Sequence, residues 1–250
     1  MEMTLMGLLV GILVGLTGVG GAALLTPVLV MIGIQPTIAV ATDLFYNSIT
    51  KLFGSIQHYR QKTIDTQLVK YLAMGSVPSA ILAITLLQVI EPLYRYQESI
   101  IKHALGFVLI IVALATIAKQ IFDRGDTVQQ VQPKTHKKGL SIAIGSVLGF
   151  LVGLTSVGSG SLFALAMLYF YRLKASELVG TDIAHAFILV SAAGMMHMGL
   201  GNVDYALAFR LLLGSVPGVL IGSYFSAKVP PKPLRTLLAA MILLSGVRLI

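Results

Sequence analysis

The chain has 250 residues, of which 56% are hydrophobic and 11% charged, with a formal net charge of +8 and no cysteine. Charged residues make up roughly a quarter of a soluble domain, so this composition excludes one and indicates an integral membrane protein. The lack of cysteine excludes disulfides, thiolate metal sites and cysteine nucleophiles. The lysines and arginines are scattered over short loops without a groove-reading motif, which argues against nucleic acid as a partner.

Apolar segments follow one another along the whole chain, and each is long enough to cross a bilayer as a helix, which takes about 20 residues. They cover residues 4–32, 37–57, 67–90, 99–118, 139–171, 177–199, 204–227 and 234–250. We therefore predict an all-α integral membrane protein. The N-terminus lacks a basic region and runs apolar too far for a signal peptide, so we expect the first segment to stay in the mature protein.

The first and fifth segments contain nearly the same glycine-rich phrase, GILVGLTGVGG at 11–21 and GFLVGLTSVGS at 149–159. Further matches follow in the same order: Thr42-Asp43 with Thr181-Asp182, His58 with His197, Asp65 with Asp204, and Gly75-Ser76-Val77-Pro78 with Gly214-Ser215-Val216-Pro217. This internal repeat predicts two homologous transmembrane halves. We place them at residues 1–121 and 139–250, joined by a polar linker at 122–138.

Basic residues do not follow the repeat, and their distribution indicates the topology. If the first and fifth segments enter and leave on the same side of the membrane, most basic residues gather on one side. These are Arg60, Lys62, Lys70, Lys119, Arg124, Lys134, Lys137, Lys138, Arg172, Lys174, Lys228, Lys232 and Arg235. The other side keeps Arg95, Lys102, Arg210 and Arg248, with Lys51 at mid-membrane depth. The positive-inside rule then predicts two inverted-topology repeats and a cytoplasmic linker.

In this topology the first segment of each repeat is a broken, re-entrant hairpin of two half-helices, with the glycine phrase at the break. Broken helices at matching positions of inverted repeats point to a transporter's binding site. The alternative is that the glycines only let helices pack closely, as in small-xxx-small interfaces. Gly7, Gly11 and Gly15 fit that alternative well, whereas the clustered Gly18, Gly20 and Gly21 fit it poorly.

Helix N-termini bind anions through unsatisfied N–H groups and the helix dipole. Gly20 and Gly21 in the first half, and residues 158–161 in the second, are placed to start the outgoing half-helices, so the expected ligand is a small oxyanion. The predicted substrate-binding residues are Thr17, Gly18, Gly20, Gly21, Asn47, Lys51, Thr155, Ser156, Gly158, Ser159 and His185. We expect no cofactor and no metal.

The helix after each hairpin carries ionisable groups, which are costly inside a membrane and by default mark a functional pathway. The candidates for gating or proton coupling are Asp43, His58, Asp182 and His197. Alternatively, the aspartates only cap or brace their helices, and the histidines are interface residues bonded to the loop carboxylates Asp65 and Asp204. Lys51 has no counterpart in the second half, where Val190 stands; its alternative role is a structural ion pair with Asp43 or another carboxylate.

Taken together, these residues resemble the sulfite exporter TauE/SafE family of membrane permeases. The resemblance rests on GLTGVGGAALLTPVL with ATDLFYNSITKLFGSIQHYRQKTID, echoed by GLTSVGSGSLF with GTDIAHAFILVSAAGMMHMGLGNVD, and covers nearly the whole chain. It implies a carrier of the bacterial inner (plasma) membrane for sulfite, sulfoacetate, thiosulfate or other sulfur-containing anions. The second half departs from the first in having Ala164-Leu165 where Thr26-Pro27 stand.

We therefore predict a transporter, not an enzyme, that moves a small sulfur-containing anion or organosulfonate by alternating access, and is an exporter. Its expected partners are this anion and the bilayer, and a homodimer is a candidate assembly. A passive anion channel could reuse the same half-helix dipoles. A third alternative is an intramembrane metalloenzyme using His58, His185, His197 and the two aspartates, although no metal-binding spacing supports it.

Overall fold

The computed structural model describes residues 1–17, 22–122, 137–171, 173–226 and 231–250. Within this part the chain forms helices and no strand, which confirms the all-α prediction. The helices are α1 (Glu2–Thr17), α2 (Ala22–Met31), α3 (Pro36–Arg60), α4 (Thr66–Val89), α5 (Glu91–Arg95), α6 (Gln97–Phe122), α7 (Lys138–Thr155), α8 (Leu162–Phe170), α9 (Ala175–Gly199), α10 (Tyr205–Ser226) and α11 (Pro231–Leu249).

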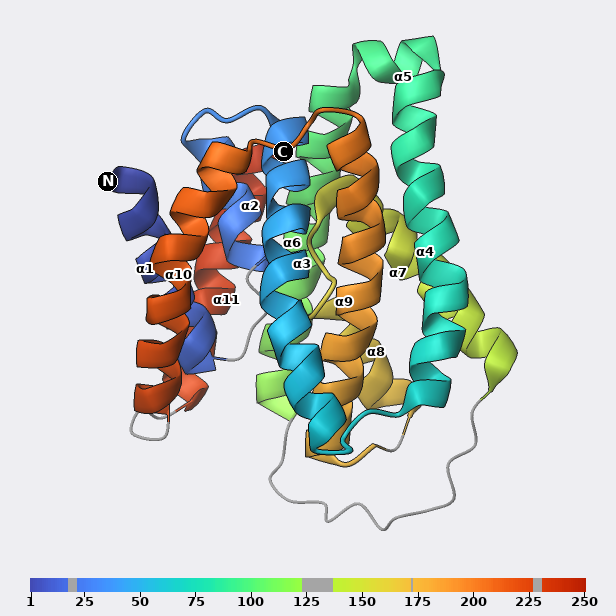
Figure 1. The fold of residues 1–250 in the computed structure, drawn as a ribbon, viewed down its shortest axis with the longest axis vertical. Helices are drawn as coiled ribbons and strands as arrows, with labels where there is room; N and C mark the ends of the chain where they lie inside the picture. The colour runs from blue at the N-terminus through green and yellow to red at the C-terminus, as the bar shows by residue number, and fades with distance from the viewer. Residues whose placement is uncertain (18–21, 123–136, 172, 227–230) are drawn as a thin grey trace.

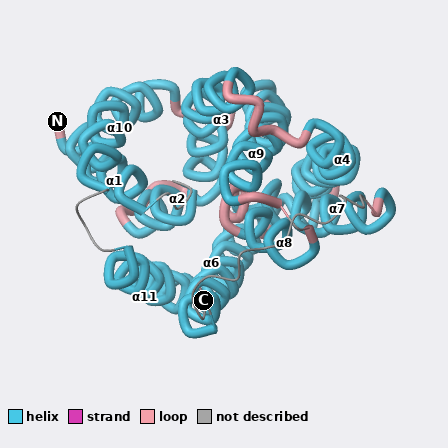
Figure 2. The backbone as a smooth tube through the Cα atoms, turned by 90° about the horizontal axis from the view of Figure 1, so that it is seen from below, coloured by secondary structure: helices cyan, strands magenta, loops and turns pink. Residues whose placement is uncertain are grey.

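Helices from the two predicted halves pack against each other in pairs. The α3–α9 pair lies between the α1–α10 pair and the α4–α7 pair, and α6 and α11 run along one side (Figure 2). α2 and α8 pack against α3 and α9, respectively. The first helix of each half thus contacts the fourth helix of the other half, so neither half forms an independent unit.

By length and composition, five described helices can cross a membrane: Thr66–Val89, Gln97–Ala118, Lys138–Thr155, Ser176–Gly199 and Tyr205–Gly222. The protein is therefore a multi-pass membrane protein. α3 has 25 residues but is less apolar than these five, because polar side chains follow one another along it. The described parts of segments 4–32 and 139–171 each form two helices rather than one.

The second glycine phrase breaks the chain between α7 and α8, as predicted. The residues of the first phrase at 18–21 lie outside the described part, between the end of α1 and the start of α2. The arms are unequal rather than two half-helices: α7 has 18 residues and α8 has 9. At a rise of about 1.5 Å per residue, α7 alone approaches the thickness of the hydrocarbon core, about 30 Å.

Glycines at intervals of four let α7 lie directly against α4. A Cβ atom on Gly145, Gly149 or Gly153 would collide with the α4 backbone, at Leu72 in the first case and Ser76 in the second. In the α1–α10 pair, Gly7 and Gly11 are equally close to the α10 backbone. The small-xxx-small interpretation is therefore correct for these glycines, whereas the glycines of the second phrase beyond them occupy the break.

This packing predicts that alanine substitution lowers the stability of the protein at one glycine of α7 but not at another. Gly149→Ala should cost about 1–3 kcal/mol, because the new methyl group overpacks the contact with Ser76. Gly139→Ala is the control, since nothing lies within 4 Å of its Cβ position. Melting of the detergent-purified variants measures the difference. Equal melting temperatures for the two variants would contradict the close α4–α7 contact.

Two reciprocal hydrogen bonds join the ends of the antiparallel pair α3 and α9. The backbone N–H of Asp65, which follows α3, donates to Thr181 Oγ1 (2.9 Å), and that of Asp204, which follows α9, donates to Thr42 Oγ1 (3.1 Å). These are corresponding residues of the sequence repeat. Each aspartate also caps the next helix, since its Oδ1 accepts the N–H of Leu68 or Leu207. The contacts fit the predicted inverted repeats, which remain a prediction.

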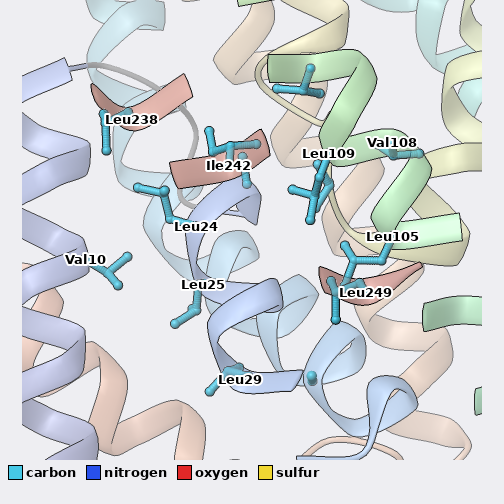
Figure 3. Close-up of a cluster of buried hydrophobic side chains, with 14 of the residues drawn as sticks. Val10, Leu24, Leu25, Leu29, Leu105, Val108, Leu109, Leu238, Ile242 and Leu249 are labelled. Atoms are coloured by element: carbon cyan, nitrogen blue, oxygen red, sulfur yellow. The ribbon is translucent and has the colours of Figure 1, made fainter. Parts of the chain in front are cut away.

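An apolar core surrounds α2, the short helix that returns from the first break. Leu24, Leu25 and Leu29 lie on α2 among side chains from α1, α6 and α11 (Figure 3). In Figure 1, α2 stands beside α3 with α11 close by. Burying each such leucine contributes about 1.5–3 kcal/mol where it is removed from water. This core fixes α2 against α3, and with it the groups that α2 presents to Asp43.

Candidate functional site

Asp43 of α3 is fully buried and connects both predicted halves. Its Oδ2 accepts from Thr26 Oγ1 of α2 (2.7 Å) and from Ser156 Oγ at the second glycine phrase (2.6 Å). Its Oδ1 accepts from Asn47 Nδ2, one helical turn further on (2.8 Å). α3 begins at Pro36, so Asp43 does not cap its helix. It braces the helix against α2 and against the second break.

Lys51 reaches the second glycine phrase from two turns further along α3. Its Nζ donates to the backbone carbonyl of Ser159 (3.0 Å) and to Ser159 Oγ (3.1 Å). No ion pair within 4.0 Å joins Lys51 to a carboxylate of the described residues, so Lys51 is not directly ion-paired there. Asp182 and Asp43 interact with it electrostatically from further away.

Asp182 is the repeat counterpart of Asp43, but it lacks the same donors. It is 7% exposed, and its Oδ1 has no hydrogen-bond partner among the described residues. In the second half, Ala186 stands in place of Asn47 and Ala164 in place of Thr26, and neither can donate through its side chain. The capping interpretation is also wrong for Asp182, because α9 begins at Ala175.

His185 lies one turn after Asp182 on α9 and is completely buried. Its Nε2 pairs with Ser76 Oγ of α4 (2.9 Å), and its ring lies against Phe163 of α8 with 4.3 Å between ring centroids. Its Nδ1 has no hydrogen-bond partner in the described part of the molecule. The buried polar atoms of Asp182 and His185 therefore lie on neighbouring turns of one helix.

The second glycine phrase, at residues 149–159, adopts backbone conformations that explain the glycine at position 158. Ser156 ends α7 in the left-handed region at φ 62°, and Gly158 follows at φ 102°. A side chain at Gly158 would also collide with Leu162 at the start of α8. Thr155 Oγ1 donates back to the carbonyl of Leu151 (2.7 Å). This turn places Ser159 beside Lys51.

Of the predicted substrate-binding residues, the structure brings Lys51, Ser159, Ser156 and Asn47 into one buried region around Asp43, with Gly158 in the turn between the two serines. The amide of Asn47 and the hydroxyl of Ser156 are engaged by Asp43. The residues Gly18, Gly20 and Gly21 lie outside the described part, as does the side chain of Thr17. The substrate-binding roles remain predictions.

The histidines at the far ends of α3 and α9 contact neighbouring loop residues. His58 Nδ1 pairs with Thr63 Oγ1 (2.8 Å), and His197 Nδ1 lies 3.3 Å from Asn202 Nδ2. His197 Nε2 has no hydrogen-bond partner among the described residues, so the expected bond to Asp204 is not formed there. Both histidines lie at helix ends, away from Lys51, and their coupling role remains a prediction.

The metalloenzyme alternative required several of these side chains to converge. Within the described ranges, no group of three histidine, cysteine, aspartate or glutamate side chains is arranged to hold a metal ion. His58 and His197 end their helices, while His185 faces Ser76.

Sequence reasoning did not assign two residues of this region. Thr26 was noted only as a departure between the halves, yet it donates to Asp43. Ser76 was noted only as part of the repeated Gly-Ser-Val-Pro motif, yet it holds His185. The sequence does contain a signal for both residues: each places a hydroxyl group in an apolar helix, and a buried hydroxyl needs a hydrogen-bond partner.

The fold and this interior define a class: a multi-pass helical membrane protein with ionisable side chains gathered around a broken helix, as in transporters. The chain belongs to the sulfite exporter TauE/SafE family, whose characteristic sequence it matches over residues 3–249. The family resemblance drawn from the glycine phrases is therefore confirmed.

Individual relatives agree with this class. The chain is 60% identical over 248 residues to "Probable membrane transporter protein YjnA" of Bacillus subtilis (strain 168), and the match covers 98% of each chain. It is 23% identical over 266 residues to "Probable membrane transporter protein YunE" of the same organism, covering 99% of this chain and 96% of the relative. A similar archaeal relative is "Probable membrane transporter protein MJ0441" of Methanocaldococcus jannaschii, 23% identical over 258 residues, covering 97% and 92%. No solved structure matches the chain significantly.

Proposed function

We propose that the protein is a carrier that moves small sulfur-containing anions, such as sulfite, sulfoacetate or other organosulfonates, across the membrane by alternating access. The observation that carries the proposal is the position of Lys51. Its ammonium group lies on Ser159, in the turn that leads into α8. The family supplies the class of substrate, since its name refers to sulfite export.

The chemistry of this position favours an anion. An ammonium group has three donors, and Ser159 supplies two acceptors, which leaves one N–H for a ligand. The positive end of the α8 dipole lies at the same turn. The N–H groups of Leu162 and Phe163 at the start of α8 already donate to the carbonyl of Gly158 (3.2 and 3.4 Å), so the direct donor for a small oxyanion is the Lys51 ammonium group, with the hydroxyl of Ser159 close by.

Alternating access requires two halves that can move against each other. The reciprocal bonds of Asp65 with Thr181 and of Asp204 with Thr42 are supporting evidence, because each ties the end of one central helix to the start of the other. We further propose that the carrier lies in the plasma (inner) membrane with residues 122–138 in the cytoplasm, and works as an exporter. An anion gains about 2.3 kcal/mol per charge per 100 mV on leaving a negative-inside cell.

Ligand binding to detergent-purified protein tests the proposal. The panel is sulfite, thiosulfate, sulfoacetate, taurine, sulfate and chloride, screened by thermal shift and then by calorimetry. A ligand at about 100 times its Kd adds about 2.7 kcal/mol to the stability of the folded state. For a chain of this length that amounts to a rise in melting temperature of roughly 5–10 °C.

Lys51→Ala should weaken binding of the selected sulfur anion by about 10- to 100-fold, because a hydrogen bond to a charged group is lost. Lys102→Ala is the matched control, since Lys102 is exposed on α6 and should bind as the wild type does. If no anion in the panel raises the melting temperature, or if both variants bind equally well, the anion site at Lys51 is wrong.

A further inference from the structure

One buried carboxylate oxygen of the interior, Oδ1 of Asp182, has no hydrogen-bond partner among the described residues, although the corresponding Asp43 has several. Asp43 is 0% exposed and accepts hydrogen bonds from three side chains. Asp182 is 7% exposed, and its Oδ1 accepts none from the residues that the structure describes. Burying a carboxylate oxygen without a donor is costly, and each such group in a folded protein calls for an explanation.

The charges that face Asp182 come mainly from α3. Lys51 lies on that helix and interacts electrostatically with Asp182, and Asp43 on the same helix interacts with Lys51. Asp65, in the loop between α3 and α4, approaches α9 through the hydrogen bond from its backbone N–H to Thr181 Oγ1. On α9 itself, His185 lies one turn after Asp182, whereas Glu177 lies in the first turn of the helix.

These charges do not balance when the site is empty. With both carboxylates ionised, Asp43 and Asp182 together outweigh the single charge of Lys51, and a neutral His185 adds none. An anion entering beside Lys51 would increase this excess of negative charge in a poorly screened interior. One proton removes the excess at Asp182 without displacing any hydrogen bond to its Oδ1.

Building on the function proposed above, we propose that Asp182 is a proton-binding site linked to the anion site: Asp182 Oδ1 takes up one proton from solvent when an anion binds at Lys51, and releases it when the anion leaves. No other bond forms or breaks in this step. A proton fits the site better than a metal cation, because the Lys51 ammonium repels both but only the proton is accommodated by a single oxygen. Binding and release of the anion are thereby coupled to proton movement.

The same geometry assigns a different role to Asp43. Its oxygens are occupied by Thr26, Ser156 and Asn47, and it is sealed from solvent. A proton on Asp43 would have to displace one of these donors. A proton on Asp182 Oδ1 needs no such displacement, because this oxygen accepts no hydrogen bond from the described residues.

The experiment measures protons taken up when thiosulfate binds to the detergent-purified full chain, with sulfoacetate as second probe. Both probes keep their charge between about pH 6 and about pH 8, so any proton uptake belongs to the protein. Calorimetry in two buffers of different ionisation enthalpy gives the number of protons per bound anion. We expect uptake approaching one proton in the wild type, and an affinity that falls by up to about tenfold per pH unit on raising the pH.

Asp182→Asn replaces the carboxyl by a neutral group of the same shape. It should still bind thiosulfate, but with no proton uptake and with the same affinity at both pH values. Glu177→Gln, on the same helix, is the matched control and should keep the wild-type linkage. Proteoliposomes add a second measurement: an imposed pH gradient should drive thiosulfate flux in the wild type and in Glu177→Gln, but not in Asp182→Asn.

The outcomes separate the two proposals. Thiosulfate or sulfoacetate binding without proton uptake in the wild type would overturn the proton site and leave the anion carrier standing. Proton uptake that persists in Asp182→Asn would also overturn it, because another group would then carry the proton. If neither probe binds at either pH, the anion site fails, and the linked proton site fails with it.

Discussion

Replacing Asp43 by alanine should lower the stability of the protein by about 3 kcal/mol or more, because three buried donors lose their acceptor at once. Thr26 and Ser156 would each keep a buried hydroxyl without its acceptor, and Asn47 would lose its contact with the carboxylate. Such a loss corresponds to a fall in melting temperature of roughly 6–12 °C for a chain of this length. Thermal melting of the detergent-purified variant measures it.

The repeat supplies a matched control for this prediction. Asp182→Ala removes the corresponding carboxylate, whose Oδ1 holds no donor among the described residues, so its cost should be smaller by about 2 kcal/mol. Asp43→Asn should fall between wild type and Asp43→Ala, because the amide keeps one acceptor oxygen. Equal losses for Asp43→Ala and Asp182→Ala would show that Asp43 does not brace the two halves.

Cross-linking the central helices should stop transport altogether. A disulfide between Asp65→Cys and Thr181→Cys would tie the end of α3 to the start of α9, where the backbone N of Asp65 and Thr181 Oγ1 lie 2.9 Å apart. Because the natural chain has no cysteine, this bond would be the sole disulfide. An alternating-access carrier held in one state cannot complete its cycle, so we expect flux in proteoliposomes to fall by about 100-fold or more.

Reduction of the disulfide in the same preparation is the internal control, since it should restore flux to the level of the single-cysteine variants. The pair Thr42→Cys and Asp204→Cys tests the opposite ends of the same two helices. A passive channel does not need this movement. Flux that persists through both oxidised variants, without counterflow, would therefore favour the channel over the carrier.

Much of the architecture could be predicted from composition and pattern. The apolar segments indicated membrane helices, because backbone N–H and C=O groups inside a bilayer must be hydrogen-bonded and a helix satisfies them within one segment. The second glycine phrase was correctly assigned to a break, since Ser156 and Gly158 have positive φ. The lengths of the arms were not predictable, because α7 continues for 18 residues through glycines that serve packing against α4.

For the candidate site as well, the sequence predicts some features and the tertiary structure decides the others. The sequence alone determined that the chain is helical, membrane-embedded and internally repeated, and that Asp43, Lys51 and Asp182 are ionisable groups inside apolar segments. Only the tertiary structure decided their partners, because Asp43 meets Ser156 across 113 positions and Lys51 meets Ser159 across 108. Such contacts depend on how α3 packs against the turn before α8, and a repeated motif cannot reveal which of two matching carboxylates finds donors there. That difference in hydrogen bonding makes Asp43 a brace and leaves Asp182 Oδ1 without a donor in the described structure.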